Sequence, residues 1–140
     1  MSDAYVDTDV IIRLLTGDDP RKQRASQSLF ESVEAGTLTL AAPDTVIADA
    51  VFVLSSPRLY AQSRPQTASM LSRLVKLPSF KVAQRRMVLE ALQIYAESSI
   101  DFGDAMLVAN MRQESSSTLY SYDRDFDRFK GIRRIEPNEQ

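Results

Sequence analysis

Residues 4–17 read "AYVDTDVIIRLLTG", a short apolar run followed at once by two aspartates. The pattern predicts a strand over residues 4–7 that ends at Asp7, and a helix over residues 10–15 for which Asp9 is the N-cap. A charge beside a core-forming segment is costly unless something stabilises it. The two aspartates therefore require either a structural partner or a function.

Strand-like and helix-like segments alternate along the chain of 140 residues, a length typical of one domain. Asp19 before Pro20 is typical of a helix start, and Gly36 of a helix end. The alternation predicts an α/β domain with a mostly parallel central sheet, spanning 1–140 as one unit with a frayed tail at 137–140. Further strands are expected at 37–42, 79–82, 118–123 and 132–137, and further helices at 18–36, 43–56, 63–77, 84–99 and 101–113, with a turn or short helix at 126–131.

The composition is that of a soluble globular protein, with 44% hydrophobic and 26% charged residues. We find no secretory signal pattern and no apolar run of membrane-spanning length, so we expect a cytoplasmic protein without a membrane partner. The chain has no Cys and no His, which excludes Ser-His-Asp triads, Cys–His pairs and imidazole or thiolate metal sites. Carboxylates remain, and they are suited to Mg²⁺ or Mn²⁺.

The net charge of −2 does not exclude a nucleic-acid partner. The chain has 17 Lys and Arg against 19 Asp and Glu; if four Asp are set aside as metal ligands, 15 acids remain and the balance is +2. This balance permits RNA or DNA binding without demonstrating it.

Four carboxylates end or interrupt apolar segments that are far apart in the sequence. Asp7 and Asp123 each end a predicted strand, and ligands of open α/β sheets bind beyond the carboxyl ends of the strands. Asp49 interrupts the otherwise apolar run "VIADAVFVL", and Asp104 lies one helical turn after Asp101. If the sheet gathers these groups, either a cation relieves their repulsion or one carboxylate stays protonated. With a cation, the pattern predicts metal-assisted hydrolysis of a phosphodiester.

Each acid also has a structural explanation, and the residues alone leave these alternatives open. Asp9 and Asp101 would serve as helix N-caps, and Asp7 as an Asx-turn residue at the end of its strand. The remaining explanations are a helix-end charge for Asp104, an ion pair with an arginine for Asp49, and solvated turn positions for Asp125 and Asp127.

Four motifs together resemble those of PIN-domain proteins, and more specifically of the VapC toxins of VapBC toxin–antitoxin modules. In order they are "YVDTDVIIRLLTGDDP", "VIADAVFVL", "DFGDAMLVANM" and "LYSYDRDFDRF". Each motif alone is weak, but four in this order and spacing are fairly specific, and they cover nearly the whole chain. The resemblance implies an α/β/α sandwich with a parallel sheet. It also implies a ribonuclease with an acidic pocket that binds Mg²⁺ or Mn²⁺.

The resemblance further implies which residues form the site. The positions of the family's four acids, as catalytic groups and metal ligands, are held by Asp7, Asp49, Asp104 and Asp123. Supporting positions are Thr8, Asp9, Asp101 and Asp125. RNA contacts are expected from the sequence itself and not from the resemblance: Arg13 lies less than two helical turns after Asp7, and a solvated surface position is the alternative. The same two explanations hold for the arginines on neighbouring segments, Arg58, Arg64, Arg112, Arg124 and Arg128. Asp9 stands where the family usually has Asn or another small polar residue. Asp49 stands where Glu is usual, and its shorter side chain reaches less far toward a metal.

The resemblance also implies partners: a small VapB-like antitoxin that holds the toxin inactive, and a second copy in a homodimer. Two rival functions remain. A degenerate PIN domain would bind RNA or a protein without cutting, in keeping with Asp at position 49. An aspartyl phosphatase of the haloacid dehalogenase type uses a D-x-D motif like "VDTDV". However, Ile11 stands where that family has Thr, and 140 residues leave little room for its core and cap.

Overall fold

The computed structural model describes residues 3–138, and every strand pair within them is parallel. The strands are β1 (Ala4–Tyr5), β2 (Leu40–Ala42), β3 (Phe80–Val82), β4 (Thr118–Tyr120) and β5 (Arg133–Ile135). Three of them form one sheet in the order β1-β2-β3, with Tyr5 opposite Ala41 and Ala41 opposite Lys81. β4 and β5 form a second, two-stranded sheet.

Within the described residues, six α-helices connect the strands and lie on both sides of the three-stranded sheet. They are α1 (Thr8–Leu15), α2 (Pro20–Glu34), α3 (Asp44–Ser55), α4 (Arg64–Val75), α5 (Arg85–Glu97) and α6 (Phe102–Gln113), and the short 3₁₀ helix η1 (Arg124–Arg128) follows β4. This order confirms the predicted α/β class with a parallel sheet. In this part of the chain no helix combines the length and the apolar character needed to cross a membrane.

Capping side chains set the starts of the first two helices. α1 begins at Thr8, earlier than predicted, because Asp7 is extended and its Oδ1 accepts the Thr8 N–H at 2.7 Å. Asp7 is therefore the N-cap, and the prediction that Asp9 caps this helix was wrong. The second helix agrees with its prediction: Asp19 accepts a first-turn N–H at 3.0 Å, and Gly36 follows the helix with a φ of 78°.

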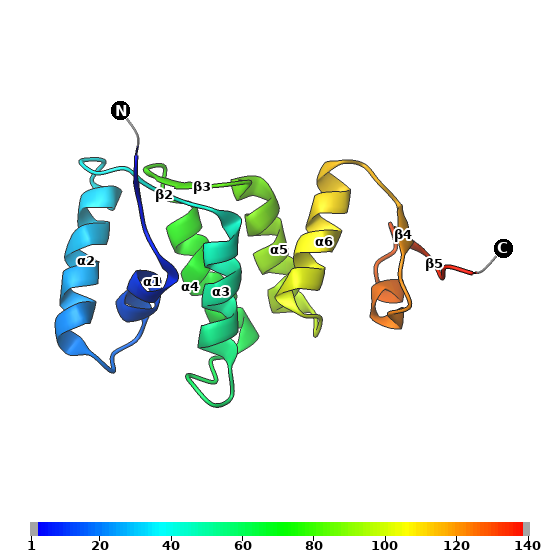
Figure 1. The fold of residues 1–140 in the computed structure, drawn as a ribbon, viewed down its shortest axis with the longest axis horizontal. Helices are drawn as coiled ribbons and strands as arrows, with labels where there is room; N and C mark the ends of the chain where they lie inside the picture. Colours follow the sequence, from blue (N-terminus) through cyan, green and yellow to red (C-terminus); the bar gives the residue numbers. More distant parts are fainter. Residues whose placement is uncertain (1–2, 139–140) are drawn as a thin grey trace.

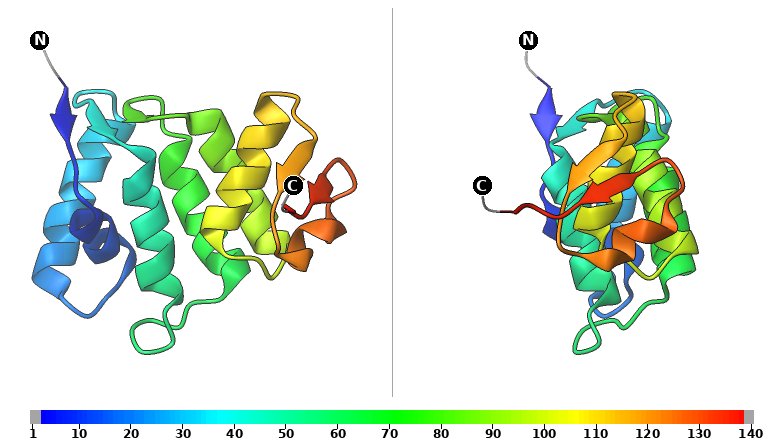
Figure 2. Two further views of the ribbon diagram at one scale, coloured as in Figure 1. Left: turned by 45° about the vertical axis from the view of Figure 1, so that its right-hand side comes forward. Right: turned by 90° about the vertical axis from the view of Figure 1, so that its right-hand side faces the viewer.

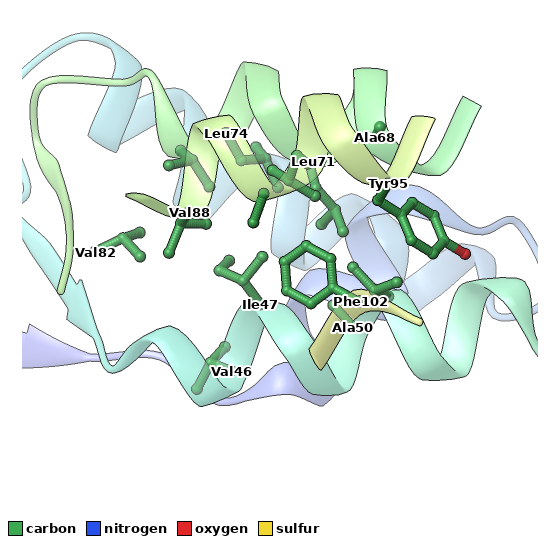
Figure 3. Close-up of a cluster of buried hydrophobic side chains, with 14 of the residues drawn as sticks. Val46, Ile47, Ala50, Ala68, Leu71, Leu74, Val82, Val88, Tyr95 and Phe102 are labelled. Carbon is green, nitrogen blue, oxygen red and sulfur yellow. The ribbon is translucent and has the colours of Figure 1, made fainter. Parts of the chain in front are cut away.

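The hydrophobic core lies mainly between α3, α4, α5 and α6 (Figure 3). Ile47 of α3 and Leu71 of α4 are fully buried in it. The rings of Tyr95 and Phe102 pack edge to face, with their centroids 5.9 Å apart. This shared core fixes α3 and α6, the two helices that carry Asp49 and Asp104.

The parallel sheet is present in two separate parts (Figures 1 and 2). In Figure 1, β1 lies to the left, β4 and β5 lie to the right, and α3 and α6 lie between them. Within residues 3–138, β1 therefore pairs only with β2, and β4 only with β5. The accessible surface of 8708 Å² also exceeds the roughly 7,300 Å² expected for a compact chain of 15.7 kDa. The molecule is more extended than one closed around a single sheet.

Candidate active site

The first group of acids lies where β1 leads into α1. Asp7 and Asp9 are exposed at the start of this helix, and Asp49 is exposed on the neighbouring α3. Exposure explains how Asp49 is tolerated in an apolar helix, because the carboxylate lies at the rim of the core and stays in water. The three acids share one open depression of about 500 Å³, whose other lining residues are Thr8, Ile12, Arg13, Val53, Leu59 and Tyr60.

Thr8 connects the two helices that carry these acids. Its N–H donates to Asp7, and its hydroxyl donates to the backbone carbonyl of Val46 in α3 at 3.3 Å. The backbone of Thr8 thus orients the Asp7 carboxylate, while its side chain holds α1 against α3. The ion pair with an arginine that was one explanation for Asp49 is absent from the five ion pairs of the described residues.

The second group of acids lies at the start of α6 and beyond the end of β4. Asp104, in the first turn of α6, is half-buried, and Asp101, Asp123 and Asp125 are exposed. Burial raises the pKa of Asp104, and the negative charges of the other three acids raise it further. Because these three charges act on Asp104, the four carboxylates form one electrostatic group.

Backbone hydrogen bonds orient Asp123 within this group. Its Oδ1 accepts the N–H of Asp125 at 2.9 Å, and its own N–H donates to the hydroxyl of Ser121 at 3.0 Å. β4 ends at Tyr120, so Asp123 lies at the start of η1 and not on the strand itself. Asp101 occupies the N-cap position of α6, but its side chain makes no capping hydrogen bond.

The two groups of acids do not combine into one metal-binding set in this structure. Within residues 3–138, no three acidic side chains form a cluster that would hold a metal ion. The chemistry of the donors fits Mg²⁺ or Mn²⁺, because all of them are carboxylates. Their placement does not fit, because Asp7 and Asp49 line the depression beside α1, whereas Asp104 and Asp123 belong to the group at the starts of α6 and η1. The strands that precede Asp7 and Asp123, β1 and β4, lie apart (Figure 1).

A polar network at the rim of the first depression was missed by the sequence reasoning. Arg13 forms an ion pair with Asp18 at 3.2 Å, and the hydroxyl of Tyr60 donates to the same carboxylate at 2.7 Å. The sequence carries one signal for this network, the two adjacent acids of "GDDP". Asp19 caps α2, so the acid before it needs a separate explanation.

Two of the other arginines expected near the site serve the fold. Arg64 donates from Nε to the carbonyl of Tyr95 at 2.9 Å and from Nη2 to the carbonyl of Ile100, and its guanidinium lies 3.7 Å from the centroid of the Tyr95 ring. Arg112 pairs with Glu90 at 3.2 Å. Both side chains stabilise contacts between elements, which leaves Arg13 as the arginine lining the first depression.

Comparison with known proteins places this site in a family. No curated protein matches the chain. The family model described as "PIN domain" matches residues 4–132, a span that contains every acid of both groups. The chain therefore belongs to the PIN-domain family.

Proposed function

We propose that the chain is an endoribonuclease that depends on Mg²⁺ or Mn²⁺. Membership of the PIN-domain family carries this proposal, because PIN domains are generally nucleases. The composition supports it, since a chain without His or Cys must hydrolyse a phosphodiester with carboxylates. One acid of each group, Asp7 after β1 and Asp123 after β4, also follows the carboxyl end of a parallel strand, where ligands of open α/β sheets bind.

The active form, in this proposal, has β4 paired with the free edge of β1, so that the two groups of acids meet. Each of these strands has one unpaired side within the described residues. Both run from top to bottom in Figure 1, so their pairing would be parallel, like the existing pairs. An unprotected edge strand readily accepts another strand, and a two-stranded sheet is only marginally stable alone.

Exposed apolar side chains support the same movement. Phe52 of α3 is 72% exposed, and on the two edge strands Tyr5 is 73% and Tyr120 is 66% exposed. α3 is apolar on almost every side apart from Asp49, which is typical of a helix covered on two faces. Placing the β4–β5 sheet over α3 and α6 would remove such surface from water, and the hydrophobic effect would favour closure.

The carboxylates would then hold the ion and the substrate in fixed positions. When bound, a divalent ion supplies an activated water and stabilises the charge that develops on the phosphate. Asp7, Asp49, Asp104 and Asp123 provide oxygen donors from four elements of the chain. In Asp7 and Asp123 a backbone N–H orients Oδ1, so that Oδ2 is available to a ligand. Asp9, Asp101 and Asp125 add negative charge around this set.

The four motifs also support a biological role as a VapC-like toxin, acting on cellular RNA in the cytoplasm. We propose that a VapB-like antitoxin inhibits the protein and that the chain forms a homodimer. Induced expression would then arrest growth, whereas expression of Asp7→Asn at the same level would not. Growth arrest by both proteins would contradict a role that depends on the carboxylate site.

The direct test of the proposed function is cleavage of RNA by the purified chain, free of antitoxin. Transfer RNA, ribosomal RNA and simple single strands are incubated with Mg²⁺ or Mn²⁺, and with EDTA as the control. Wild type should cut at least one of these RNAs in a metal-dependent manner, and Asp7→Asn and Asp104→Asn should not. Equal cutting by all three proteins would mean that the activity comes from another source.

A second candidate function is RNA binding without cleavage. The observation in its favour is that no three acids form a metal-binding cluster within the described residues, and Asp49 is the shorter of the two acids suited to its position. The same assay decides between the candidates. Metal-dependent cutting of any structured RNA that requires Asp7 would eliminate the binder, and RNA binding without cutting on every substrate would favour it.

A further inference from the structure

Asp18 joins three side chains through one carboxylate. Its Oδ1 lies 3.2 Å from Nη1 of Arg13 and 3.1 Å from Oγ1 of Thr16, and its Oδ2 accepts the hydroxyl of Tyr60 at 2.7 Å. Arg13 belongs to α1, whereas Tyr60 lies in the connection between α3 and α4, 42 residues after Asp18 in sequence. Asp18 therefore ties this connection to the first helix. In keeping with these contacts, the pKa of Asp18 lies below its ordinary value, and the hydrogen bond from the Tyr60 hydroxyl is the largest cause.

Arg13 lines the same depression as Asp7, Asp9 and Asp49, yet it forms its ion pair with a carboxylate outside this depression. Asp9 is one helical turn before Arg13, a spacing at which opposite charges commonly pair. Within the described residues, Arg13 instead pairs with Asp18, which does not line the depression. The Arg13 side chain is 34% exposed, so a further anion has access to its guanidinium.

The connection beside Arg13 presents an apolar surface to the same depression. Leu59 is 58% exposed, and the ring of Tyr60 is partly buried with its hydroxyl fixed on Asp18. A guanidinium next to an apolar or aromatic surface suits a nucleotide, because the cation binds the phosphate and the surface contacts the base. Only an unstacked base offers its face in this way, which favours single strands and loops over duplexes.

We infer that Asp18 is a positioning residue that holds Arg13 and Tyr60 as the rim of a binding site for single-stranded RNA. The inference rests on the proposed function and adds to it the residue that positions an RNA contact, in which Arg13 binds a phosphate beside an unstacked nucleotide. Asp18 does not touch the RNA. It turns the guanidinium away from Asp9 and fixes the connection that carries Leu59.

The substitution Asp18→Asn separates positioning from general electrostatics, because the two effects have opposite signs. Removing a negative charge strengthens RNA binding in general. Losing the contact that positions Arg13 weakens RNA binding, since the guanidinium is then drawn to Asp9. The matched control is Asp19→Asn, which removes the same charge one residue away and leaves a residue that caps α2 equally well.

Binding is measured as the fluorescence anisotropy of a labelled single-stranded RNA of about 12 nucleotides, a length within the range that single-strand sites cover. EDTA is present, so that cleavage does not contribute, and the KCl concentration is varied. We expect Asp18→Asn to bind roughly fivefold more weakly than Asp19→Asn. Arg13→Gln should lose a similar factor and lower the slope of log K against log salt by about one.

Two further variants test whether Asp18 acts through its partners. Adding Asp18→Asn to Arg13→Gln should weaken binding less than Asp18→Asn weakens the wild type, because the part of the Asp18 effect that acts through Arg13 has then already been removed. Tyr60→Phe keeps the ring but loses the hydroxyl, and it should show a smaller loss than Asp18→Asn. Melting temperatures close to that of the wild type establish that the compared variants are folded.

The outcomes distinguish this inference from the proposed function. Binding by Asp18→Asn as tight as that by Asp19→Asn, or tighter, would overturn the inference while the wild-type affinity still supported an RNA enzyme. Equally tight binding of a duplex of the same sequence would overturn the assignment to single strands. If the wild type bound no RNA, the proposed function would fail, and the inference with it.

Discussion

At the scale of single residues, Asp7 and Asp9 stand two positions apart and are expected to contribute differently. The Asp7 carboxylate is oriented by the Thr8 N–H, whereas Asp9 adds charge within α1. Asp7→Asn should lower the rate of RNA cleavage roughly 100-fold or more, since a misplaced catalytic group costs about that much. Asp9→Asn should have a mild effect. RNA cleavage rates of the two variants, measured with Mn²⁺, check this prediction. An equal loss of rate in Asp7→Asn and Asp9→Asn would contradict the division of roles.

Asp104 is expected to lower the stability of the folded chain at neutral pH. Burial and the charges of Asp101, Asp123 and Asp125 raise its pKa above the ordinary value, so the folded state disfavours its ionised form. This cost is fully present above the raised pKa and disappears below the ordinary one. Asp104→Asn should therefore melt roughly 1–3 °C higher at neutral pH, with the gain shrinking as the pH falls through the pKa of Asp104.

Melting curves of wild type and Asp104→Asn across acidic and neutral pH, in EDTA, check this prediction. The same substitution should abolish cleavage, so stability and activity would change in opposite directions. A lower melting temperature for Asp104→Asn at neutral pH would show that its carboxylate stabilises the fold through a contact and does not destabilise it through repulsion.

How far residues can be assigned from sequence depends on how local their contacts are. Asp19 and Gly36 were assigned correctly, because a cap and a left-handed helix end involve neighbours only. Asp9 was wrongly assigned as a cap because the helix begins earlier: Asp7, two positions before it, has an extended backbone and accepts the Thr8 N–H. The bond from Tyr60 to Asp18 spans 42 residues, and no local pattern encodes such a contact.

At the scale of elements, Arg64 connects the start of α4 to the end of α5. It donates to the carbonyl oxygens of Tyr95 and Ile100 and stacks on the Tyr95 ring, so its loss leaves partly buried carbonyls unpaired. Arg64→Gln should lower the free energy of unfolding by about 2 kcal/mol, as measured by urea denaturation. The control is Arg58→Gln, because Arg58 is exposed and should tolerate the change. Equal effects of both changes would contradict this role.

The pairing of β1 with β4 can be tested by distance measurements between the two strands. The chain has no Cys, so Tyr5→Cys/Tyr120→Cys provides two unique attachment points for spin labels. In the closed form the strands would lie about 5 Å apart, so Mg²⁺ with a non-cleavable RNA should produce a new short distance. The control pair Tyr5→Cys/Lys81→Cys lies within the existing sheet and should not change. An unchanged long distance between positions 5 and 120 under all conditions would contradict closure.

The elements themselves were largely predictable, but the pairing of the strands was not. Apolar runs predicted the strands and the α-helices around the acids, and all observed pairs are parallel as expected. The cap of α1 and the place of Asp123 at the start of η1 were not predicted. The division into two sheets has no local signal, because β1 is two residues long and the pattern of β4 does not specify its neighbour. The expected frayed tail at 137–140 lies partly outside the described residues.

At the scale of the whole molecule, the two groups of acids and the large accessible surface have one common explanation. Closing β4 onto β1 would bury exposed aromatic surface and would also bring like charges together. The first effect favours closure and the second opposes it, so closure should depend on a cation that neutralises the carboxylates. The sequence predicted which acids would form the site and which metal ions suit them. The balance between burial of aromatic surface and repulsion of carboxylates could not be predicted in this way, because it depends on how all the elements are arranged.

The most direct test of a nuclease completed by closure is RNA cleavage by a chain locked in the closed form. In Tyr5→Cys/Tyr120→Cys, a short flexible bismaleimide would join the two edge strands within one chain, and the cross-linked monomer is purified by size. We predict that this monomer cuts RNA with Mg²⁺ at least as fast as the uncross-linked double variant, and that adding Asp7→Asn abolishes the activity. An inactive cross-linked monomer beside an active uncross-linked one would contradict a site formed between β1 and β4.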